Sequence, residues 1–255
     1  MLITFGAGVM IGTQTQDGTG AAVSNPSPIQ FGILQEVTPD ESFELKMLYG
    51  ANKFPVAVAQ GKGTMGLKAK LANINAELVN TFLYGLTLTA GYRAIYEDLT
   101  GTSVPTAPGE ITPTIHGTAL VDLGVVSTIN GVPYTRVASS PTGGQYAFSA
   151  GSGIYTFDAV HDYAKTVFIN YVYGDAAVLT GKLLTVVNQP MGVQPVFAVD
   201  LMTQYLGKTV YVHYPQVIAT KLSRTFKNDD FSIPDFEMNA FADSSGVVYS
   251  AYFYE

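Results

Sequence analysis

The alternation of apolar and polar positions predicts β-strands along most of the chain. In the clearest stretch, every second residue from Phe43 to Tyr49 is apolar or aromatic, and the residues between them are mostly charged. A period of two is the period of a strand. Turn-forming residues follow at 50–55. We therefore predict a long antiparallel hairpin over 43–71, with a return strand whose Ala and Gly residues let another backbone approach closely.

One segment directly after this hairpin has the helical period instead. Its apolar stripe, spaced i, i+3, i+4 and i+7, consists of Leu71, Ile74, Leu78, Val79, Phe82 and Leu83. We expect Asn73 to cap the start of the helix and Gly85 to end it. The stripe should pack on a sheet, because a single apolar stripe is typical of a helix that covers a core.

Further strands are predicted in the rest of the chain, short ones first and longer ones near the end. The short ones are 118–127, 134–138, 145–148, 153–157 and 166–173, and the longer ones are 181–188, 195–202, 209–214, 217–226, 234–242 and 247–254. Turn-forming residues at 206–208 and 243–246 separate neighbouring strands. Short strands divided by frequent turns indicate a small β module in the middle of the chain.

Changes in composition divide the chain. A stretch rich in Thr, Pro and Gly and a later Gly-Asp-Ala sequence are typical of linkers. We therefore predict one β domain built from 31–108 and 176–255, with a small β module inserted at 109–175. Residues 1–30 are rich in Gly, Thr, Ser and Pro, and we expect them to form an extended N-terminal arm.

The composition narrows the class of protein. Charged residues are 13% of the 255 residues and hydrophobic residues are 47%, whereas roughly 25% of an average domain is charged. This balance argues against a disordered or coiled-coil protein. A folded chain with few surface charges suggests that partner subunits cover much of its surface. The net charge is −7, and the acidic excess is largest in the predicted insert, as in a solvated module.

Several kinds of chemistry are excluded by what the chain lacks. It has no cysteine, so disulfides, thiolate metal sites and thiol nucleophiles are ruled out. It has no apolar run of roughly 18 residues, so we expect no helix to cross a membrane. Sequence-independent DNA binding is disfavoured because it needs clustered Lys and Arg.

No motif predicts a cofactor or a metal. The three histidines, His116, His161 and His213, lack the spacing of metal ligands. The sequence at 207–209 resembles the end of a phosphate-binding loop, but no helix pattern follows it. The sequence at 61–66 has the spacing of a dinucleotide fingerprint without the βαβ unit that gives it meaning. We expect no cofactor, no metal and no enzymatic activity.

Two other interpretations stay open at this point. A hydrolase could use a pair such as Asp235 and Glu237, although a solvated strand side explains both carboxylates more simply. The insert is rich in Tyr and Phe, so Tyr155 and its neighbours could stack on a carbohydrate. Packing in a core is the stronger interpretation, because Trp is absent and Arg is rare near these aromatics.

Two groups of residues carry a resemblance to a known class of proteins. The first is the long hairpin followed directly by the helix, together with the C-terminal sequence from Lys221 to Gly246, which contains FKNDDFSIPDFE. This combination resembles the major tail (tail tube) proteins of tailed bacteriophages. The second group lies in the insert at 132–137, 141–146 and 154–157, and it is similar to a small β module of phage virion proteins.

The resemblance implies an antiparallel β-sandwich or barrel with one flanking helix. Subunits of this family would form hexameric rings, and the rings would stack into a tube that conducts DNA without binding it specifically. The implied location is the tail of the virion, after synthesis in the host bacterial cytoplasm. The implied partners are further copies of the chain and other tail proteins, with no membrane insertion. At the hairpin tip, Tyr49, Asn52, Lys53 and Phe54 are then candidate contacts between subunits.

The resemblance also makes Asp235 and Glu237 candidate carboxylates of the lumen, where negative charge would keep passing DNA off the wall. The hairpin departs from that expectation, because it carries Lys46, Lys53, Lys62, Lys68 and Lys70. These lysines either face acids of a neighbouring subunit or make the lumen less acidic. The alternative is another phage virion β protein, such as a capsid decoration protein or a carbohydrate-binding baseplate component.

Overall fold

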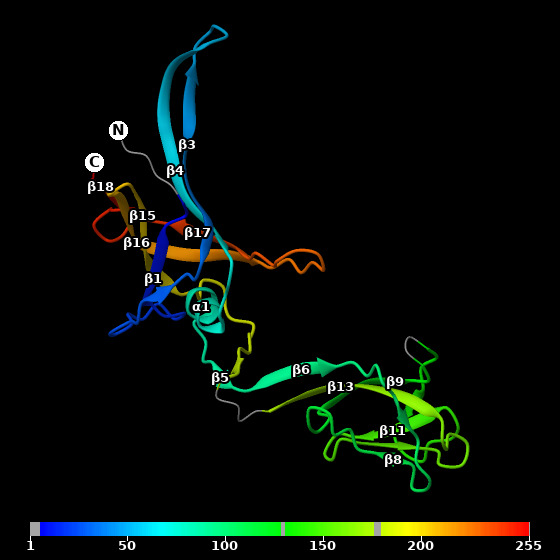
Figure 1. Ribbon diagram of the computed structural model, residues 1–255. Helices are drawn as coiled ribbons and strands as arrows, with labels where there is room; N and C mark the ends of the chain where they lie inside the picture. Colours follow the sequence, from blue (N-terminus) through cyan, green and yellow to red (C-terminus); the bar gives the residue numbers. More distant parts are fainter. Residues whose placement is uncertain (1–5, 129–130, 176–179, 255) are drawn as a thin grey trace. The chain divides into compact units, whose positions relative to one another are not determined.

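The computed structural model describes residues 6–128, 131–175 and 180–254. The chain divides into two compact units (Figure 1). Unit 1 combines Met1–Leu88 with Leu184–Glu255, and unit 2 is Thr89–Leu183. Both units are built mainly from antiparallel strands, which confirms the mainly β fold class.

Unit 1 contains one eight-stranded sheet with the order β2-β1-β15-β16-β17-β4-β3, and β18 also pairs with β16. Its strands are β1 (Val9–Gln16), β2 (Ile29–Gln30), β3 (Leu34–Tyr49), β4 (Pro55–Leu71), β15 (Val196–Tyr205), β16 (Lys208–Ser223), β17 (Asp235–Ala240) and β18 (Ser250–Tyr254). The predicted hairpin is confirmed as β3 and β4, and β3 begins earlier than expected. Strands from both ends of the chain thus share one sheet.

Strand β1 corrects the predicted extended arm. Residues 9–16 pair along β15, and Met10 is only 1% exposed. Gly12 lets this strand fit, because a Cβ at that position would lie 2.4 Å from Cζ of Phe82. Part of a segment rich in Gly, Thr, Ser and Pro can therefore be an interior strand when neighbouring elements pack against it.

The strands predicted at 209–214 and 217–226 form the single strand β16. Pro215 lies between them, and proline has no N–H to donate to a partner strand. On that edge, β18 pairs with β16 as far as His213 and β17 begins pairing at Val217. Pro215 therefore sits in the gap between two partner strands, where it interrupts no ladder.

One side of the sheet, called here the core side, carries the core of unit 1. Its centre is a group of four phenylalanines, each at most 1% exposed: Phe31, Phe82, Phe197 and Phe236. The ring of Phe31 stacks on Phe82 at 5.0 Å between centroids and meets Phe236 edge-on at 5.5 Å. The ring of Phe82 lies 4.4 Å from Phe197. The opposite side of the sheet is called the outer side.

The predicted helix is present, but it starts later than expected. It comprises α1 (Ala76–Val79) and the π-helical turn η1 (Asn80–Tyr84). Asn75 is the cap, because its side chain accepts a hydrogen bond from the backbone N–H of Leu78 at 2.7 Å. Asn73, the predicted cap, instead accepts from the N–H of Ile33 at 2.8 Å. Gly85 ends the helix as predicted, with a left-handed φ of 63°.

Unit 2 contains two four-stranded sheets and one two-stranded pair. Its strands are β5 (Thr89–Ala90), β6 (Tyr92–Tyr96), β7 (Thr102–Ser103), β8 (Glu110–Ile111), β9 (Val121–Val126), β10 (Thr135–Val137), β11 (Gln145–Ser149), β12 (Ile154–Phe157), β13 (Thr166–Asp175) and β14 (Lys182–Leu183). The predicted insert at 109–175 lies within unit 2, which is wider because β6 pairs with β13. The strand predicted at 181–188 is reduced to β14.

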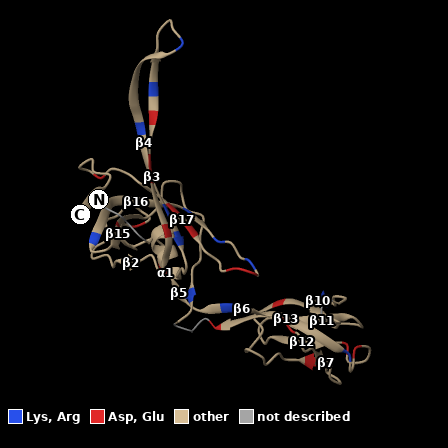
Figure 2. Cartoon of the chain, turned by 45° about the horizontal axis from the view of Figure 1, so that its top comes forward, with Lys and Arg blue, Asp and Glu red and all other residues tan. Residues whose placement is uncertain are grey.

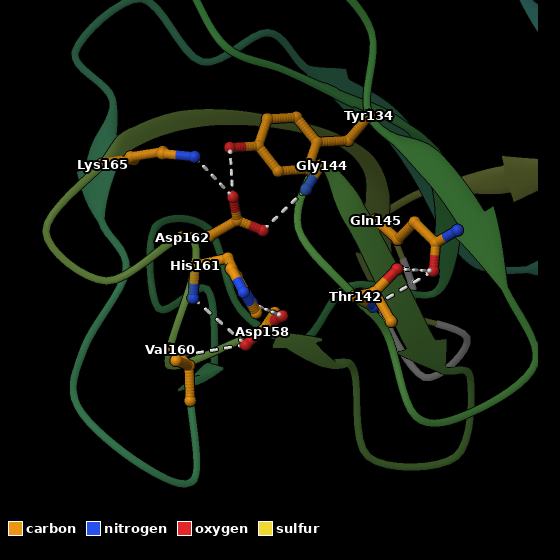
Figure 3. A network of polar contacts seen from close by, with 9 residues as sticks. All are labelled: Tyr134, Thr142, Gly144, Gln145, Asp158, Val160, His161, Asp162 and Lys165. Carbon is orange, nitrogen blue, oxygen red and sulfur yellow. Dashed lines mark hydrogen bonds and ion pairs between the residues drawn. The ribbon is translucent and has the colours of Figure 1, made fainter.

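A buried carboxylate ties the loops of unit 2 together (Figure 3). Asp162 is completely buried. It accepts a hydrogen bond from the backbone N–H of Gly144 at 2.9 Å and pairs with the ammonium of Lys165 at 2.9 Å. The hydroxyl of Tyr134 lies 3.5 Å from the same carboxylate. A buried charge needs such partners, so we assign Asp162 a structural role.

Two tyrosines of unit 1 make its stability fall at alkaline pH. The hydroxyl of Tyr211 donates to Asp200 at 2.6 Å, and this hydrogen bond is the main reason that the pKa of Tyr211 is raised to about 12. Burial raises the pKa of Tyr214 to about 12. An unfolded tyrosine has a pKa of roughly 10. The folded state therefore holds both protons more tightly.

We expect the free energy of unfolding of unit 1 to fall as the pH rises from about 10 to about 12. The two tyrosines contribute their full stabilisation below a pH of about 10, the pKa of an unfolded tyrosine. This stabilisation is lost as the pH rises to the pKa of about 12 that both have in the folded state. Urea unfolding followed by circular dichroism across this range measures it. Tyr211→Phe should flatten the pH dependence, whereas the control Tyr254→Phe removes a hydroxyl from a residue that is 70% exposed. Equal slopes in Tyr211→Phe and the wild-type protein would contradict the assignment.

Candidate assembly surface

The distal half of the β3–β4 hairpin extends beyond the sheet of unit 1 (Figure 1). Strand β17 pairs with β4 only from Met65 to Lys70. From Pro55 to Thr64, β4 pairs only with β3. Strand β3 ends the order of the sheet, so its outer backbone edge has no strand partner among the described residues. Open edges of this length are normally protected in a free protein, because they pair with other chains.

One side of this distal hairpin is apolar and exposed. Its side chains, called here the apolar hairpin side, are Phe43 (48% exposed), Leu45 (62%), Met47 (48%), Tyr49 (57%), Val56 (66%) and Val58 (56%). The register explains why they share one side: Met47 is directly opposite Val58, and the other positions follow at steps of two along each strand. Contiguous apolar surface of this kind marks an interaction site.

The apolar hairpin side continues the core side of the sheet. On β4, Met65, Leu67 and Ala69 are buried in the core of unit 1, and Gly63, two residues before Met65, is opposite Phe43. A groove of about 390 Å³ at the hairpin base is lined by Phe43 and Met65 among others. Between Phe43 and Leu45 the register shifts by one residue, because Gly63 is opposite Phe43 and Gln60 is opposite Leu45. This extra residue in β4 brings Val58 and Val56 to the same side as Phe43. That side of the hairpin is thus covered by the protein's own core at its base and uncovered along its distal half.

The other side of the hairpin has a different character. Glu44 and Lys46 lie there and form an ion pair at 2.9 Å, and Ala59 is directly opposite Lys46. Leu48, which is 63% exposed, is opposite Ala57. Leu48 is the one large apolar residue among these, and single exposed apolar residues are normal on a protein surface. Only the apolar hairpin side carries a contiguous group of them that calls for a partner.

The four predicted contact residues lie at the tip of this hairpin. Tyr49 is on the apolar hairpin side, and its hydroxyl lies 3.2 Å from the sulfur of Met47. Asn52 and Lys53 are exposed in the turn, and Phe54 is 81% exposed. The sequence prediction missed the apolar residues behind the tip as contacts. Their alternation was visible, but only the register shows that nothing in unit 1 covers them.

Asp235 and Glu237, the predicted lumen carboxylates, lie on the outer side of the sheet, opposite the buried Phe236 and Met238. Figure 2 shows acidic and basic residues close together near β17. Asp235 is directly opposite Lys70, and Glu237 is opposite Lys68. From the other neighbouring strand, Lys221 pairs with Glu237 at 3.1 Å. Carboxylates and ammonium groups therefore alternate across neighbouring strands, an arrangement that stabilises a sheet.

Glu36 on β3 completes this charge pattern. Its carboxylate pairs with the ammonium of Lys70 at 2.6 Å. The hydrogen bond from Lys70 lowers the pKa of Glu36, and the same contact raises the pKa of Lys70. With Lys46, which pairs with Glu44, three of the five hairpin lysines thus stand beside acids of their own chain. The sequence prediction missed this pairing, because partners on different strands are separated by many residues.

The other candidate sites have structural surroundings. Tyr155 is completely buried, which contradicts its role as an exposed carbohydrate platform. His213 and Tyr211 both contact the carboxylate of Asp200, and His161 lies 2.6 Å from Asp158. Among the residues described here, no three His, Asp or Glu side chains are grouped so that they could hold a metal ion.

In the described part of the chain, no helix has both the length and the apolar character needed to cross a membrane. A scan against protein-family models found no matching family, and a search of curated proteins found no match.

Proposed function

We propose that this protein is a structural subunit that assembles into stacked hexameric rings, forming the tail tube of a tailed bacteriophage. The observation that carries the proposal is the apolar hairpin side, where six exposed apolar residues continue the core side of the sheet past its end. The resemblance of the hairpin, the helix and the C-terminal sequence to tail tube proteins is the reason for proposing this particular family. A second copy is the natural cover for such a surface, because pairing between copies also closes the open strand edges.

In this proposal the outer side of β4 and β17 faces the lumen. Asp235 and Glu237 stay the candidate lumen carboxylates, with Lys68, Lys70 and Lys221 beside them. Mutually paired charges present little net charge to passing DNA, so the wall neither captures phosphates nor depends strongly on salt. This replaces a uniformly acidic wall by one whose charges are balanced within each subunit.

Purified protein is expected to form rings and stacked tubes as its concentration is raised. Negative-stain electron microscopy and sedimentation velocity measure this directly. Stacked rings with a central channel support the tail tube. Discrete trimers or monomers at all concentrations would contradict it and favour a capsid decoration or baseplate protein.

A further inference from the structure

A second apolar surface of unit 1 lies beside the helix. It is a groove of about 860 Å³, within the roughly 300–1,000 Å³ typical of binding clefts. Val79 and Leu83 of the helix line it, together with Val186 and Leu222. Val186 is 53% exposed. Val79 is buried, and Leu83 and Leu222 pack against the core. The groove is thus an open site at the edge of the core, with Val186 as its exposed apolar wall.

The groove also contains positive charge. Lys221 and Arg224 line it. Lys221 is paired with Glu237 at 3.1 Å, whereas Arg224 is exposed and has no ionic partner among the described residues. An apolar groove with one free guanidinium fits a segment that combines apolar anchors with a carboxylate.

The loop between β16 and β17 has these properties. Figure 1 shows it projecting from the sheet of unit 1. Phe226 is 85% exposed and Phe231 is 88% exposed, and Asp229 and Asp230 lie between them. The carboxylate of Asp230 is 4.0 Å from the ammonium of Lys227, while Asp229 has no ionic partner in the described part of the chain. Because both rings are exposed, the loop does not occupy the groove of its own copy.

We propose that the loop at 226–231 of one copy docks in the helix-side groove of a second copy, with its phenylalanines on the apolar lining and Asp229 facing Arg224. The proposal rests on the proposed self-assembly and names a contact within it. Loop and groove are different surfaces of one chain, so the contact is heterologous, and a heterologous contact that closes generates a ring. The loop contributes the negative charge of Asp229 and the groove the positive charge of Arg224, so the two surfaces are complementary.

Charge exchange between two variants tests the docking. Arg224→Asp and the pair Asp229→Arg with Asp230→Arg should each lower the association constant by roughly tenfold or more in sedimentation velocity at low salt. Mixing the two variant proteins should restore assembly, because each groove then meets a loop of opposite charge. Arg93→Asp, an exposed arginine of unit 2, is the matched control and should behave as the wild-type protein. Arg224→Gln gives a milder version of the same loss.

The outcomes separate this inference from the proposed function. If the wild-type protein forms tubes and both charge variants also form them, the loop docking is wrong and the tail tube proposal stands. If the variants lose association and mixing restores it, but only open oligomers form, the docking holds and the tail tube proposal fails. If mixing does not restore assembly, the loop and the groove do not contact each other between copies, and the docking is overturned. A wild-type protein that is monomeric at every concentration overturns both.

Discussion

Replacing Leu45 by aspartate is expected to abolish self-association while the monomer stays folded. Leu45 is 62% exposed in the centre of the apolar hairpin side, so the free chain loses little buried surface. In an assembly that covers this side, the new carboxylate would be buried without a partner. Changing a central interface residue in this way should weaken the free energy of association by about 3 kcal/mol, which is roughly a hundredfold in the association constant. Sedimentation velocity and negative-stain microscopy measure the loss.

Leu48 supplies the matched control for this substitution. It lies on the same strand, is 63% exposed, and points to the opposite side of the hairpin, where Ala57 is its cross-strand neighbour. Leu48→Asp should therefore associate far better than Leu45→Asp. Circular dichroism and thermal melting of both variants check that the monomers remain folded. Equal losses in the two variants would show that the apolar hairpin side is not the specific contact.

The second large effect is on stability and concerns Phe31. This side chain is completely buried and contacts Phe82 and Phe236 in the core of unit 1. Phe31→Ala removes a ring that its neighbours cannot replace, and we expect the free energy of unfolding of unit 1 to fall by about 3–5 kcal/mol. Urea unfolding followed by circular dichroism measures the change, and Phe31→Leu should lose about half as much.

Phe43→Ala is the control for the Phe31 experiment. Phe43 is a residue of the same type in the same sheet, but it is 48% exposed. Its truncation should destabilise the monomer by about 1 kcal/mol or less, because only half of its surface is covered, while weakening self-association. A similar loss of stability in both variants would mean that the distal hairpin is packed in the monomer. A wild-type unfolding curve for Phe31→Ala would contradict the placement of the core.

The local sequence pattern predicted those elements for which all residues in a short window favour the same secondary structure. The hairpin follows from alternation at every second position, and Gly85 ends the helix because glycine accepts the left-handed conformation found there. The start of the helix could not be placed in the same way. Asn73 and Asn75 are both good caps by residue type. The side chain of Asn73 does not cap the helix, because it accepts a hydrogen bond from the N–H of Ile33, forty positions away in the chain.

Strand β1 and the candidate lumen carboxylates also depend on contacts that a local pattern does not reveal. Residues 9–16 belong to a segment whose Gly, Thr, Ser and Pro content predicts an arm, but β15 pairs with them and the rings of Phe31 and Phe82 fill the space over Gly12. Asp235 and Glu237 were correctly placed on one strand side, whereas their lysine neighbours come from β4 and β16. Both facts depend on which strands are adjacent, and adjacency is not a local property of the chain.

By itself, the sequence determined the mainly β class, the long hairpin, the presence of the helix with its end at Gly85, and the low content of charged residues, because each depends on spacing or composition within a short window. Only the tertiary structure decided which side of the hairpin stays uncovered, which acids and lysines stand together, and that the loop at 226–231 and the helix-side groove are separate exposed surfaces. These depend on strand order and register, which bring distant residues into contact and leave others without any.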